Sequence, residues 1–437
     1  MSKTAAAVKE PAKIKPPIKV LGVIGAGTMG SGIAQKAAME GAEVILVDQA
    51  QKYLDKGKAS IEKILKEGVE RKVFKPERAE AVMKRMKFTV DLSALKDADL
   101  VIEAIYEDEK AKGELFAKLE TVCPQKTIFA SNTSSLSVEK LAKSAGRPDR
   151  FVGLHFFFHP VKNRLIEVVP IAATTPETFK RVFNYCRSSG KIPIETKDAA
   201  GFAVNRFFVP WLNEAVRLLE QGIADIPTIE EAAKRAFGIG MGPFGLMNAT
   251  GVPIAYHAAA GLGRALGHFY DPAQKLKEQV DAKKDWPLEG GADESKFKKV
   301  SDRLQGVVFT VACCIAEEGV ATREDIDRGA KIGLRWAKGP FEMMNAAGLK
   351  HAAHRVQRIC DKYGVKFPMS LRKTETWELS LVDLAVENGV AKIVLNRPEA
   401  MNALNVEFVR QFSRRLREAQ HAAGARVITI EGRGKAF

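Results

Sequence analysis

The chain of 437 residues is 46% hydrophobic and 28% charged, a balance typical of soluble globular proteins and not of collagen-like, disordered or membrane-spanning chains. Its length predicts two or three domains, because single hydrophobic cores stop growing at roughly 250 to 300 residues. The net charge of +15 is spread along the whole chain without a nucleic-acid-binding motif. The positive charge therefore favours an anionic ligand, such as a nucleotide or a phosphorylated coenzyme, over a nucleic acid.

Residues 1–18 are rich in lysine, alanine and proline and lack the apolar core of a secretory signal. We expect a flexible leader, a cytoplasmic location and no membrane partner, since no run reaches the ~20 apolar residues of a spanning helix. The five cysteines are odd in number and scattered, without the spacing of a metal site or a disulfide framework. They predict reduced thiols and no bound metal.

The segment IKVLGVIGAGTMGSGIAQKAAMEGAEVILVDQ, at 18–49, predicts a strand, a glycine turn, a helix and a second strand. Its GxGxxG pattern provides a tight turn, room for a pyrophosphate and close packing of the helix on the sheet. The aspartate that ends the second strand suits the 2′-hydroxyl of NAD and repels the 2′-phosphate of NADP. The alternative is a glycine turn in some other α/β sheet. The predicted cofactor contacts here are Gly25, Gly27, Thr28, Met29, Gly30 and Asp48.

More apolar strands follow in ADLVIEAI, KTIFASNTS, RFVGLHFFF, RLIEVVPI and KIPIETK, with helical patterns between them. They predict a doubly wound, Rossmann-type α/β sheet over residues 19–200. Ligands of such sheets bind at the carboxyl ends of the strands. Ser134 and His155 are both predicted to lie at such ends.

Beyond residue 200 the strand patterns give way to amphipathic helices that contain an internal repeat. MGPFGLMNATG at 241–251 recurs as KGPFEMMNAAG at 338–348, an offset of 97 residues. In each copy a threonine followed three residues later by an acidic residue, at Thr228 and Thr322, predicts a capped helix start. We expect an all-α domain built of two copies.

The last part of the chain returns to strand patterns around one helix and is short for a new α/β domain. The predicted organisation is therefore a leader, an NAD-binding domain, two helical copies and an incomplete α/β tail. Their expected ranges are 1–18, 19–200, 201–300, 301–375 and 376–437.

Six ordered motifs resemble those of the L-3-hydroxyacyl-CoA dehydrogenases of fatty-acid β-oxidation. They are VIGAGTMGSGIAQ, EAIYEDEKAKGELF, ASNTSSLS, GLHFFFHPVKNRLIEV, GFAVNRFFVPWLNEA and MGPFGLMN. The resemblance implies NAD-dependent oxidation of a (3S)-3-hydroxyacyl-CoA to the 3-oxoacyl-CoA. The tail resembles the start of the enoyl-CoA hydratase (crotonase) family, through KIVLNRPEAMNALN and VITIEGRGKAF. It implies a truncated crotonase segment without that family's active site.

Oxidation of a secondary alcohol needs a base for the hydroxyl proton, and imidazole titrates in the useful range. A carboxylate on the other ring nitrogen fixes the tautomer and steadies the imidazolium. His155 and Glu167 are predicted to meet across successive strands, in a dry pocket built by neighbouring phenylalanines. From the residues alone, His155 is equally a core histidine and Ser134 a turn former. The resemblance implies catalytic roles for His155, Glu167, Ser134 and Asn205, and cofactor contacts at Asp48, Glu107 and Lys112.

Two positions depart from the family pattern. The family often has HFFNP where this chain has HFFFHP, so Phe158 or His159 replaces an asparagine that contacts NAD, and His159 is a second candidate base. Ile64 stands where the family has a serine that contacts coenzyme A. Recognition of the acyl carrier is then expected from neighbours, namely Lys63, Lys66 or Arg71.

Two other functions fit the same motifs: a same-fold NAD dehydrogenase of a free hydroxy or sugar acid, and a non-catalytic dinucleotide-binding protein. Retention of the full set of four site residues argues against a non-catalytic protein, since a structural role would not require all four. Single-repeat members of the family pair through their helical domains. Two copies in one chain satisfy that contact internally, so we predict a monomer.

Overall fold

The computed structural model describes residues 18–434, so the predicted leader lies outside it except for Ile18. The N-terminal part is a single eight-stranded sheet with the strand order β3-β2-β1-β4-β5-β6-β7-β8. All neighbours are parallel except β6 and β7, which pair antiparallel. The strands are β1 (Val20–Ile24), β2 (Glu43–Val47), β3 (Met86–Thr89), β4 (Leu100–Glu103), β5 (Ile128–Ser131), β6 (Phe151–Phe156), β7 (Leu165–Pro170) and β8 (Ile192–Glu195).

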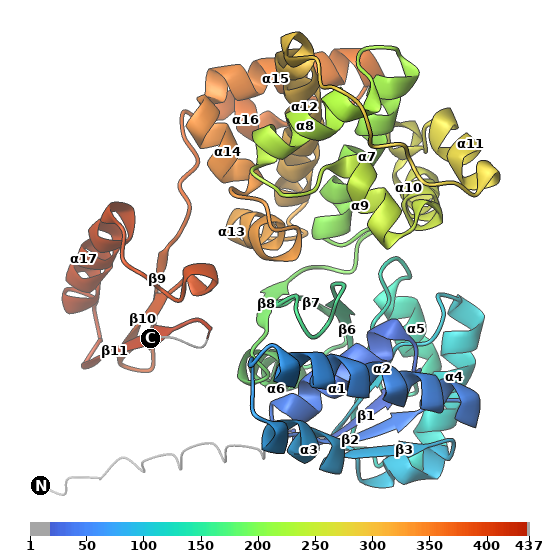
Figure 1. The fold of residues 1–437 in the computed structure, drawn as a ribbon. Helices are drawn as coiled ribbons and strands as arrows, with labels where there is room; N and C mark the ends of the chain where they lie inside the picture. Colours follow the sequence, from blue (N-terminus) through green and yellow to red (C-terminus); the bar gives the residue numbers. More distant parts are fainter. Residues whose placement is uncertain (1–17, 435–437) are drawn as a thin grey trace, which may run out of the picture.

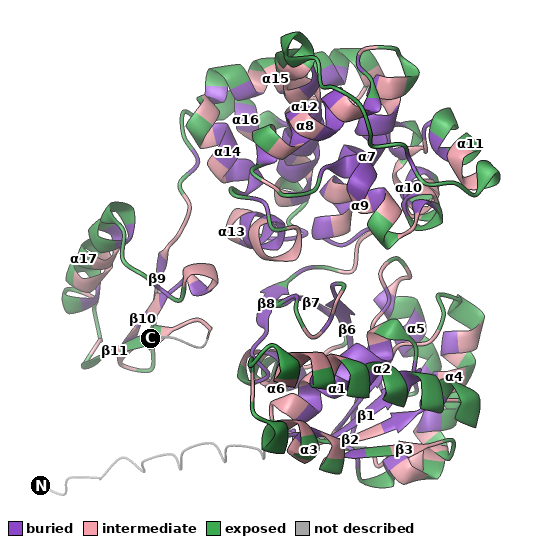
Figure 2. Cartoon of the chain, viewed as in Figure 1, coloured by how far each residue is buried: buried purple, intermediate pink, exposed green. Residues whose placement is uncertain are grey.

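Helices cover both faces of this sheet (Figure 1), which confirms the predicted doubly wound fold class. Buried side chains of α1, α2, α3 and α6 pack together on one face, and those of α4 and α5 pack on the other. The helices are α1 (Thr28–Met39), α2 (Gln51–Glu70), α3 (Pro76–Lys84), α4 (Glu109–Val122), α5 (Val138–Ser144) and α6 (Pro176–Ser188). The purple strands in Figure 2 lie between these two helical layers.

The central part is all-α, and its second half repeats the first. It comprises α7 (Val204–Glu220), α8 (Ile226–Phe237), α9 (Pro243–Thr250), α10 (Val252–Leu266), α11 (Gln274–Ala282), α12 (Phe297–Glu317), α13 (Arg323–Arg328), the π-helical turn η5 (Gly329–Gly333), α14 (Pro340–Ala347), α15 (Leu349–Tyr363) and α16 (Met369–Lys373). Both bounds of α14 and α15 fall 97 residues after those of α9 and α10. The expected boundary between residues 300 and 301 falls inside α12, so we propose to divide the copies before Phe297.

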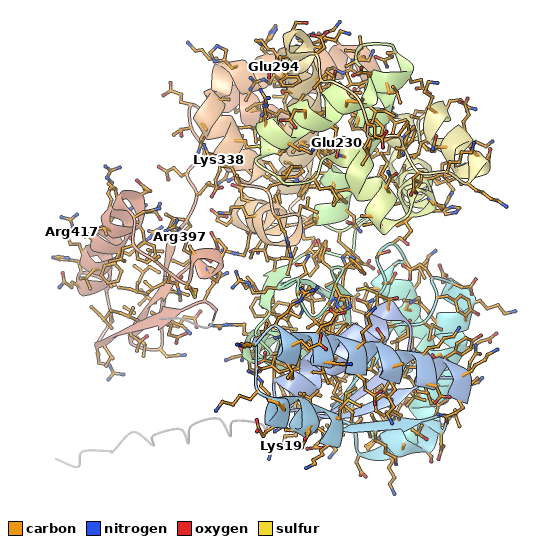
Figure 3. All side chains as sticks on the ribbon, in the orientation of Figure 1. Lys19, Glu230, Glu294, Lys338, Arg397 and Arg417 are labelled. Atoms are coloured by element: carbon orange, nitrogen blue, oxygen red, sulfur yellow. The ribbon has the colours of Figure 1, made fainter. Side chains whose placement is uncertain are left out.

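The repeat extends to individual contacts. The Asn248 side chain bonds to the backbone N–H and C=O of Trp286 at 2.8 and 2.9 Å, and Asn345 does the same with Trp377, at 2.8 Å for both bonds. A buried acid holds the start of the following helix in each copy. Glu230, which lies within the helical domain in Figure 3, accepts from backbone N–H groups at the start of α9, and Asp327 accepts from those of α14.

One predicted helix cap was wrong. Asp225, not Thr228, caps α8, because the aspartate precedes the first turn and accepts the N–H of Thr228 at 3.1 Å. Thr322 caps α13 as predicted, accepting the N–H of Asp325 at 3.1 Å.

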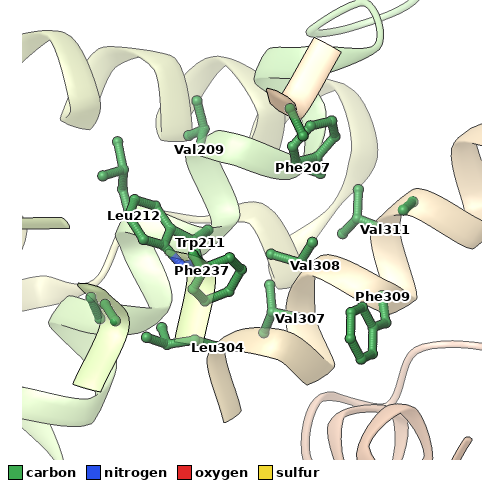
Figure 4. Packing of buried hydrophobic residues seen from close by; sticks show 14 of the residues in the cluster. Phe207, Val209, Trp211, Leu212, Phe237, Leu304, Val307, Val308, Phe309 and Val311 are labelled. Carbon is green, nitrogen blue, oxygen red and sulfur yellow. The ribbon is translucent and has the colours of Figure 1, made fainter. Parts of the chain in front are cut away.

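A single hydrophobic core joins the two helical copies. Figure 4 shows side chains of α7 and α12 packed against each other, with Trp211 and Phe237 beside Val307 and Val308. Trp336 of the second copy lies 4.5 Å from the ring of Phe237 of the first. The copies therefore fold as one unit, because neither could bury its apolar face alone.

The C-terminal part is a small three-stranded sheet with one helix, as the strand patterns predicted. Its strand order is β11-β10-β9, with β10 parallel to β11 and antiparallel to β9. The elements are β9 (Val382–Glu387), β10 (Val390–Leu395), α17 (Val406–Gln420) and β11 (Val427–Gly432). Within residues 18–434, no helix combines the length and apolarity needed to cross a bilayer.

Candidate active site

His155 and Glu167 face each other across β6 and β7. The two residues are direct partners in the antiparallel register, and the His155 Nδ1 lies 2.6 Å from a carboxylate oxygen of Glu167. Glu167 is fully buried and His155 is 6% exposed. The predicted pair therefore exists. Because Nδ1–H donates to the carboxylate, the Nε2 atom carries the lone pair that can accept a proton.

The second oxygen of Glu167 is held by the start of α7. It accepts from the backbone N–H groups of Ala203 and Val204, at 3.1 and 2.9 Å. The amino end of a helix favours negative charge, so these donors suit a buried carboxylate. Both oxygens of Glu167 thus have partners, and the imidazole cannot turn without breaking a charged hydrogen bond.

The three phenylalanines after His155 point in different directions. Phe156 joins the core of the sheet, Phe157 lies 4.5 Å from the imidazole ring, and Phe158 is 61% exposed. The predicted pocket of several phenylalanines was therefore only partly right. Alternation along the strand end separates the rings, and Phe202, at 5.9 Å, supplies the other aromatic neighbour.

Ser134 lies in a turn organised by Glu107. One Glu107 oxygen accepts from the Thr133 hydroxyl at 2.6 Å and from the N–H groups of Ser134 and Ser135 at 2.8 and 3.1 Å. The Ser134 hydroxyl is 3.4 Å from the same oxygen, so it is only weakly engaged and can serve a ligand. The turn thus presents Ser134 from the carboxyl end of β5.

Lys112 lies behind Glu107. Its ammonium, 1% exposed, is 2.5 Å from Glu103 and 3.2 Å from the second oxygen of Glu107. Burial acts to raise the pKa of Glu107, but the charge of Lys112 and the hydrogen bonds from Thr133 and Ser134 outweigh it and lower the pKa. We propose that Lys112 acts by keeping Glu107 ionised and in place.

A cavity of about 710 Å³ opens at the carboxyl ends of β1, β2 and β4. The predicted contacts Gly25, Gly27, Thr28 and Asp48 line it. A Cβ on Gly27 would meet nothing within 4 Å, whereas one on Gly25 would lie 2.5 Å from the carbonyl oxygen of Ala104. Gly27 therefore leaves the space that a pyrophosphate needs at the start of α1.

The other predicted cofactor contacts support the shape of the glycine turn or pack near it. Gly30 lies against the carbonyl of Gly25, and Met29 packs toward the core of the sheet. Asp48 accepts the N–H of Ala26 at 2.7 Å and that of Gln49 at 2.7 Å. Sequence reasoning missed part of the cavity lining, because these residues lie outside the glycine motif, although Tyr106 falls within the EAIYEDEKAKGELF motif. They are Tyr53, Lys56, Ser60, Tyr106 and Lys118.

Asn205 is the second residue of α7, directly after Val204, whose N–H holds Glu167. The neighbouring Arg206 forms two 2.6 Å hydrogen bonds with Glu318 of the second helical copy. The sequence did not predict a role for Asn132. Its side-chain oxygen accepts the N–H of Phe156 at 2.9 Å. It ties the end of β5, which carries Ser134, to the end of β6, which carries His155.

His159 has no carboxylate partner within the described residues. Its Nδ1 accepts the N–H of Val161 at 3.3 Å. Burial lowers the pKa of His159, and the charges of Lys162 and Lys191 lower it further. The imidazole is therefore neutral near pH 7 but lacks the orienting acid that His155 has, so the geometry favours His155 as the base.

A buried lysine holds the loop between β6 and β7. Lys191, 3% exposed, donates to the carbonyl oxygens of Pro160 and, at 2.7 Å, Asn163. No carboxylate of the described chain forms an ion pair with it. Burial, reinforced by the charge of Lys36, lowers the pKa of Lys191 to about 7.

Comparisons with known proteins agree with this geometry. The 3-hydroxyacyl-CoA dehydrogenase NAD-binding domain matches residues 20–199, and the C-terminal domain of the same family matches twice, at 201–290 and 300–385. An enoyl-CoA hydratase/isomerase family matches residues 390–437.

Three similar proteins illustrate the range of the match. The mitochondrial hydroxyacyl-coenzyme A dehydrogenase of Rattus norvegicus is 42% identical over 241 residues, which cover 54% of this chain and 77% of the relative. A fatty acid oxidation complex subunit alpha of Shewanella loihica is 32% identical over 387 residues, covering 82% of this chain and 54% of the relative. The structure of 3-hydroxybutyryl-CoA dehydrogenase from Escherichia coli K12 shares the fold, with a TM-score of 0.76 and 24% identity over 82% of this chain and 98% of that one.

Lys191→Met should change how stability depends on pH. Folding lowers the pKa of Lys191 from 10.5 to about 7, so between these values the unfolded chain binds more protons and stability rises with pH. The contribution is at most about 1.4 kcal/mol per pH unit. Thermal unfolding of both proteins from pH 7 to 10 should show this rise only in the unmodified protein. Parallel curves would contradict the assignment, and Lys162→Met, at an exposed position beside it, is the control.

Proposed function

The chain belongs to the 3-hydroxyacyl-CoA dehydrogenase family, and we propose that His155 is the general base in its oxidation of (3S)-3-hydroxyacyl-CoA to 3-oxoacyl-CoA. The protein is an NAD-dependent dehydrogenase of fatty-acid β-oxidation. The role of His155 is supported by the buried 2.6 Å contact between its Nδ1 atom and one carboxylate oxygen of Glu167. The other oxygen of Glu167 accepts two N–H groups at the start of α7. This arrangement leaves Nε2 as the proton acceptor.

The residues of the glycine turn fit a dinucleotide. Gly27 leaves open space, the N-terminus of α1 faces it, and Asp48 lies at the edge of the same cavity. NAD held by these residues would supply the hydride acceptor for the carbon that bears the hydroxyl group. His155 takes the hydroxyl proton on Nε2, and Glu167 stabilises the imidazolium that forms.

Ser134 and Asn205 are proposed to position the substrate. Ser134 has a weakly engaged hydroxyl at the end of β5, and Asn132 ties that strand end to the one bearing His155. Asn205 directly follows Val204, whose N–H holds Glu167, so its backbone is placed close to the pair. Two such polar side chains near His155 would orient the hydroxyl and the thioester for transfer.

Recognition of coenzyme A is proposed for the outer face of α2. Lys63 and Lys66 are exposed on α2, Arg71 is exposed directly after it, and Ile64 is half-buried. Their cations suit the phosphates of the carrier, which a free hydroxy acid lacks. The family match favours an acyl-CoA substrate over a free acid. The cytoplasmic location also remains a prediction.

His155→Gln should lower the rate of NADH formation by ~10²-fold or more, because the proton acceptor is lost. NADH binding, followed by fluorescence titration, should stay close to that of the unmodified protein. His159→Gln is the matched control and should have a far smaller effect, since no acid orients that ring. Turnover near the unmodified rate in His155→Gln would refute the role of His155.

Asp48 should make the enzyme prefer NAD to NADP, since its carboxylate repels the 2′-phosphate. Asp48→Ser combined with Gln49→Arg should narrow the ratio of kcat/KM between the two cofactors, because the added cation attracts that phosphate. Both residues line the cofactor cavity. The ratio is measured by initial rates with each cofactor. Equal kcat/KM values in the unmodified protein would contradict the proposed contact.

We also propose that the protein is a monomer, because α7 and α12 of the two copies share one core. Each copy then covers the surface that a second subunit would cover in a single-copy relative. Light scattering at micromolar concentration should return the mass of one chain, 47.8 kDa. A stable mass of twice that value would overturn the proposal.

A further inference from the structure

The π-helical turn η5 of the second helical copy packs against both sides of the His155–Glu167 pair. A Cβ on Gly329 would lie 2.5 Å from the Val204 side chain, and the Val204 N–H binds Glu167. A Cβ on Gly333 would lie 2.5 Å from the Leu165 side chain and 3.7 Å from Phe157, the ring neighbour of His155. The turn approaches this closely because both positions lack a side chain.

A direct hydrogen bond joins η5 to the loop between β6 and β7. The Gly333 carbonyl oxygen accepts from the Asn163 side-chain amide at 2.9 Å, and the amide oxygen of Asn163 accepts the N–H of Leu165 at 3.1 Å. The Asn163 carbonyl is in turn held by Lys191. η5 is therefore part of the support of the strand ends that carry the pair.

The first helical copy differs at this point. Ala232 and Ala236 occupy the places of Gly329 and Gly333, 97 residues earlier, and α8 continues as a regular α-helix to Phe237. π-Helical turns inside helices are rare and are found mostly at functional sites. The two copies thus diverge where the second one meets the pair.

The C-terminal part of the chain contacts η5 and α13, the helix that precedes it. Arg328, 3% exposed, donates to the Asn396 side-chain oxygen at 2.7 Å. Lys331 binds Glu399 at 3.0 Å and Glu342, at the start of α14, at 2.6 Å. Glu399 also lies 3.5 Å from the Arg328 guanidinium. Arg328, directly before the turn, and Lys331 within it are therefore both bound by one loop of the hydratase-like part, residues 396–399, in addition to their carboxylate partners Asp325 and Glu342.

We propose that the 396–399 loop of the hydratase-like part is a positioning element for the dehydrogenase: through Arg328 and Lys331 it fixes η5, and η5 fixes the spacing of His155 and Glu167. The inference rests on the proposed role of His155. Loss of Glu399 or Asn396 removes anionic and amide partners from cations that are largely out of water, so the turn must shift to re-solvate them. A shift of the turn moves Val204 and Leu165, and with them the two sides of the pair.

The test compares Glu399→Gln and Asn396→Ala, singly and together, with the unmodified full chain. The double variant should lower kcat for NAD-dependent oxidation of 3-hydroxybutyryl-CoA by roughly 3- to 30-fold, with KM for NAD unchanged. The acid limb of the pH profile of kcat should move to lower pH, because a displaced Glu167 stabilises the imidazolium less. The control is Glu431→Gln, which breaks an exposed ion pair with Lys392 in the three-stranded C-terminal sheet. It should change neither kcat nor the acid limb of its pH profile.

Rates are expressed per NADH-binding site, so that loss of folded protein does not count as loss of kcat. Gly333→Ala should act in the same direction without touching the C-terminal part, and Gly240→Ala, where a Cβ meets open space, is its control. Unchanged kcat and an unchanged pH profile in the double variant would overturn the proposal, as would a lowered melting temperature with normal kcat per site. If the unmodified chain forms no NADH, the proposed function fails instead.

Discussion

The buried carboxylate of Glu167 is the constraint on which the rest of the site depends. An ionised acid with no exposed surface is costly unless each of its oxygens has a partner. Here one oxygen faces His155 and the other accepts two N–H groups from the start of α7. The start of α7 therefore supplies partners to a carboxylate that lies in the sheet, and the His155–Glu167 pair is fully hydrogen-bonded only when the two parts pack together.

This requirement explains where the antiparallel strand lies. If β7 ran parallel to β6, a long crossover would separate their facing residues. The antiparallel pairing instead brings residues only twelve apart into direct register, and the loop between them stays short. Lys191 and Asn163 then fix that loop through backbone carbonyls and side-chain amide bonds. A short, doubly held loop gives the imidazole little freedom, which is the condition for efficient proton transfer.

Local patterns were sufficient to predict the fold class, the glycine turn and the contact of His155 with Glu167. Each depends on residues close in sequence or on a period that one strand or helix imposes. The helix cap at Asp225, the aromatic neighbour Phe202 and the strand tie at Asn132 were not predicted, because they depend on which segments meet in space. The part of the cofactor cavity lined by Tyr53 and Lys118 was not predicted either, because it also depends on which segments meet in space.

Two buried lysines, one beside the cofactor cavity and one beside His155, have different kinds of hydrogen-bond acceptors. Lys112 lies between Glu103 and Glu107, so its cation is matched by carboxylates and serves to fix the turn that bears Ser134. Lys191 has only carbonyl oxygens as acceptors, and burial lowers its pKa to about 7. A neutral amine keeps two N–H donors, so the loop after His155 stays held in either protonation state. The site thereby combines an ionic support beside the cofactor cavity with a support beside His155 that adds little charge. Under the proposed role of His155, Glu167 is then the carboxylate that stabilises the imidazolium.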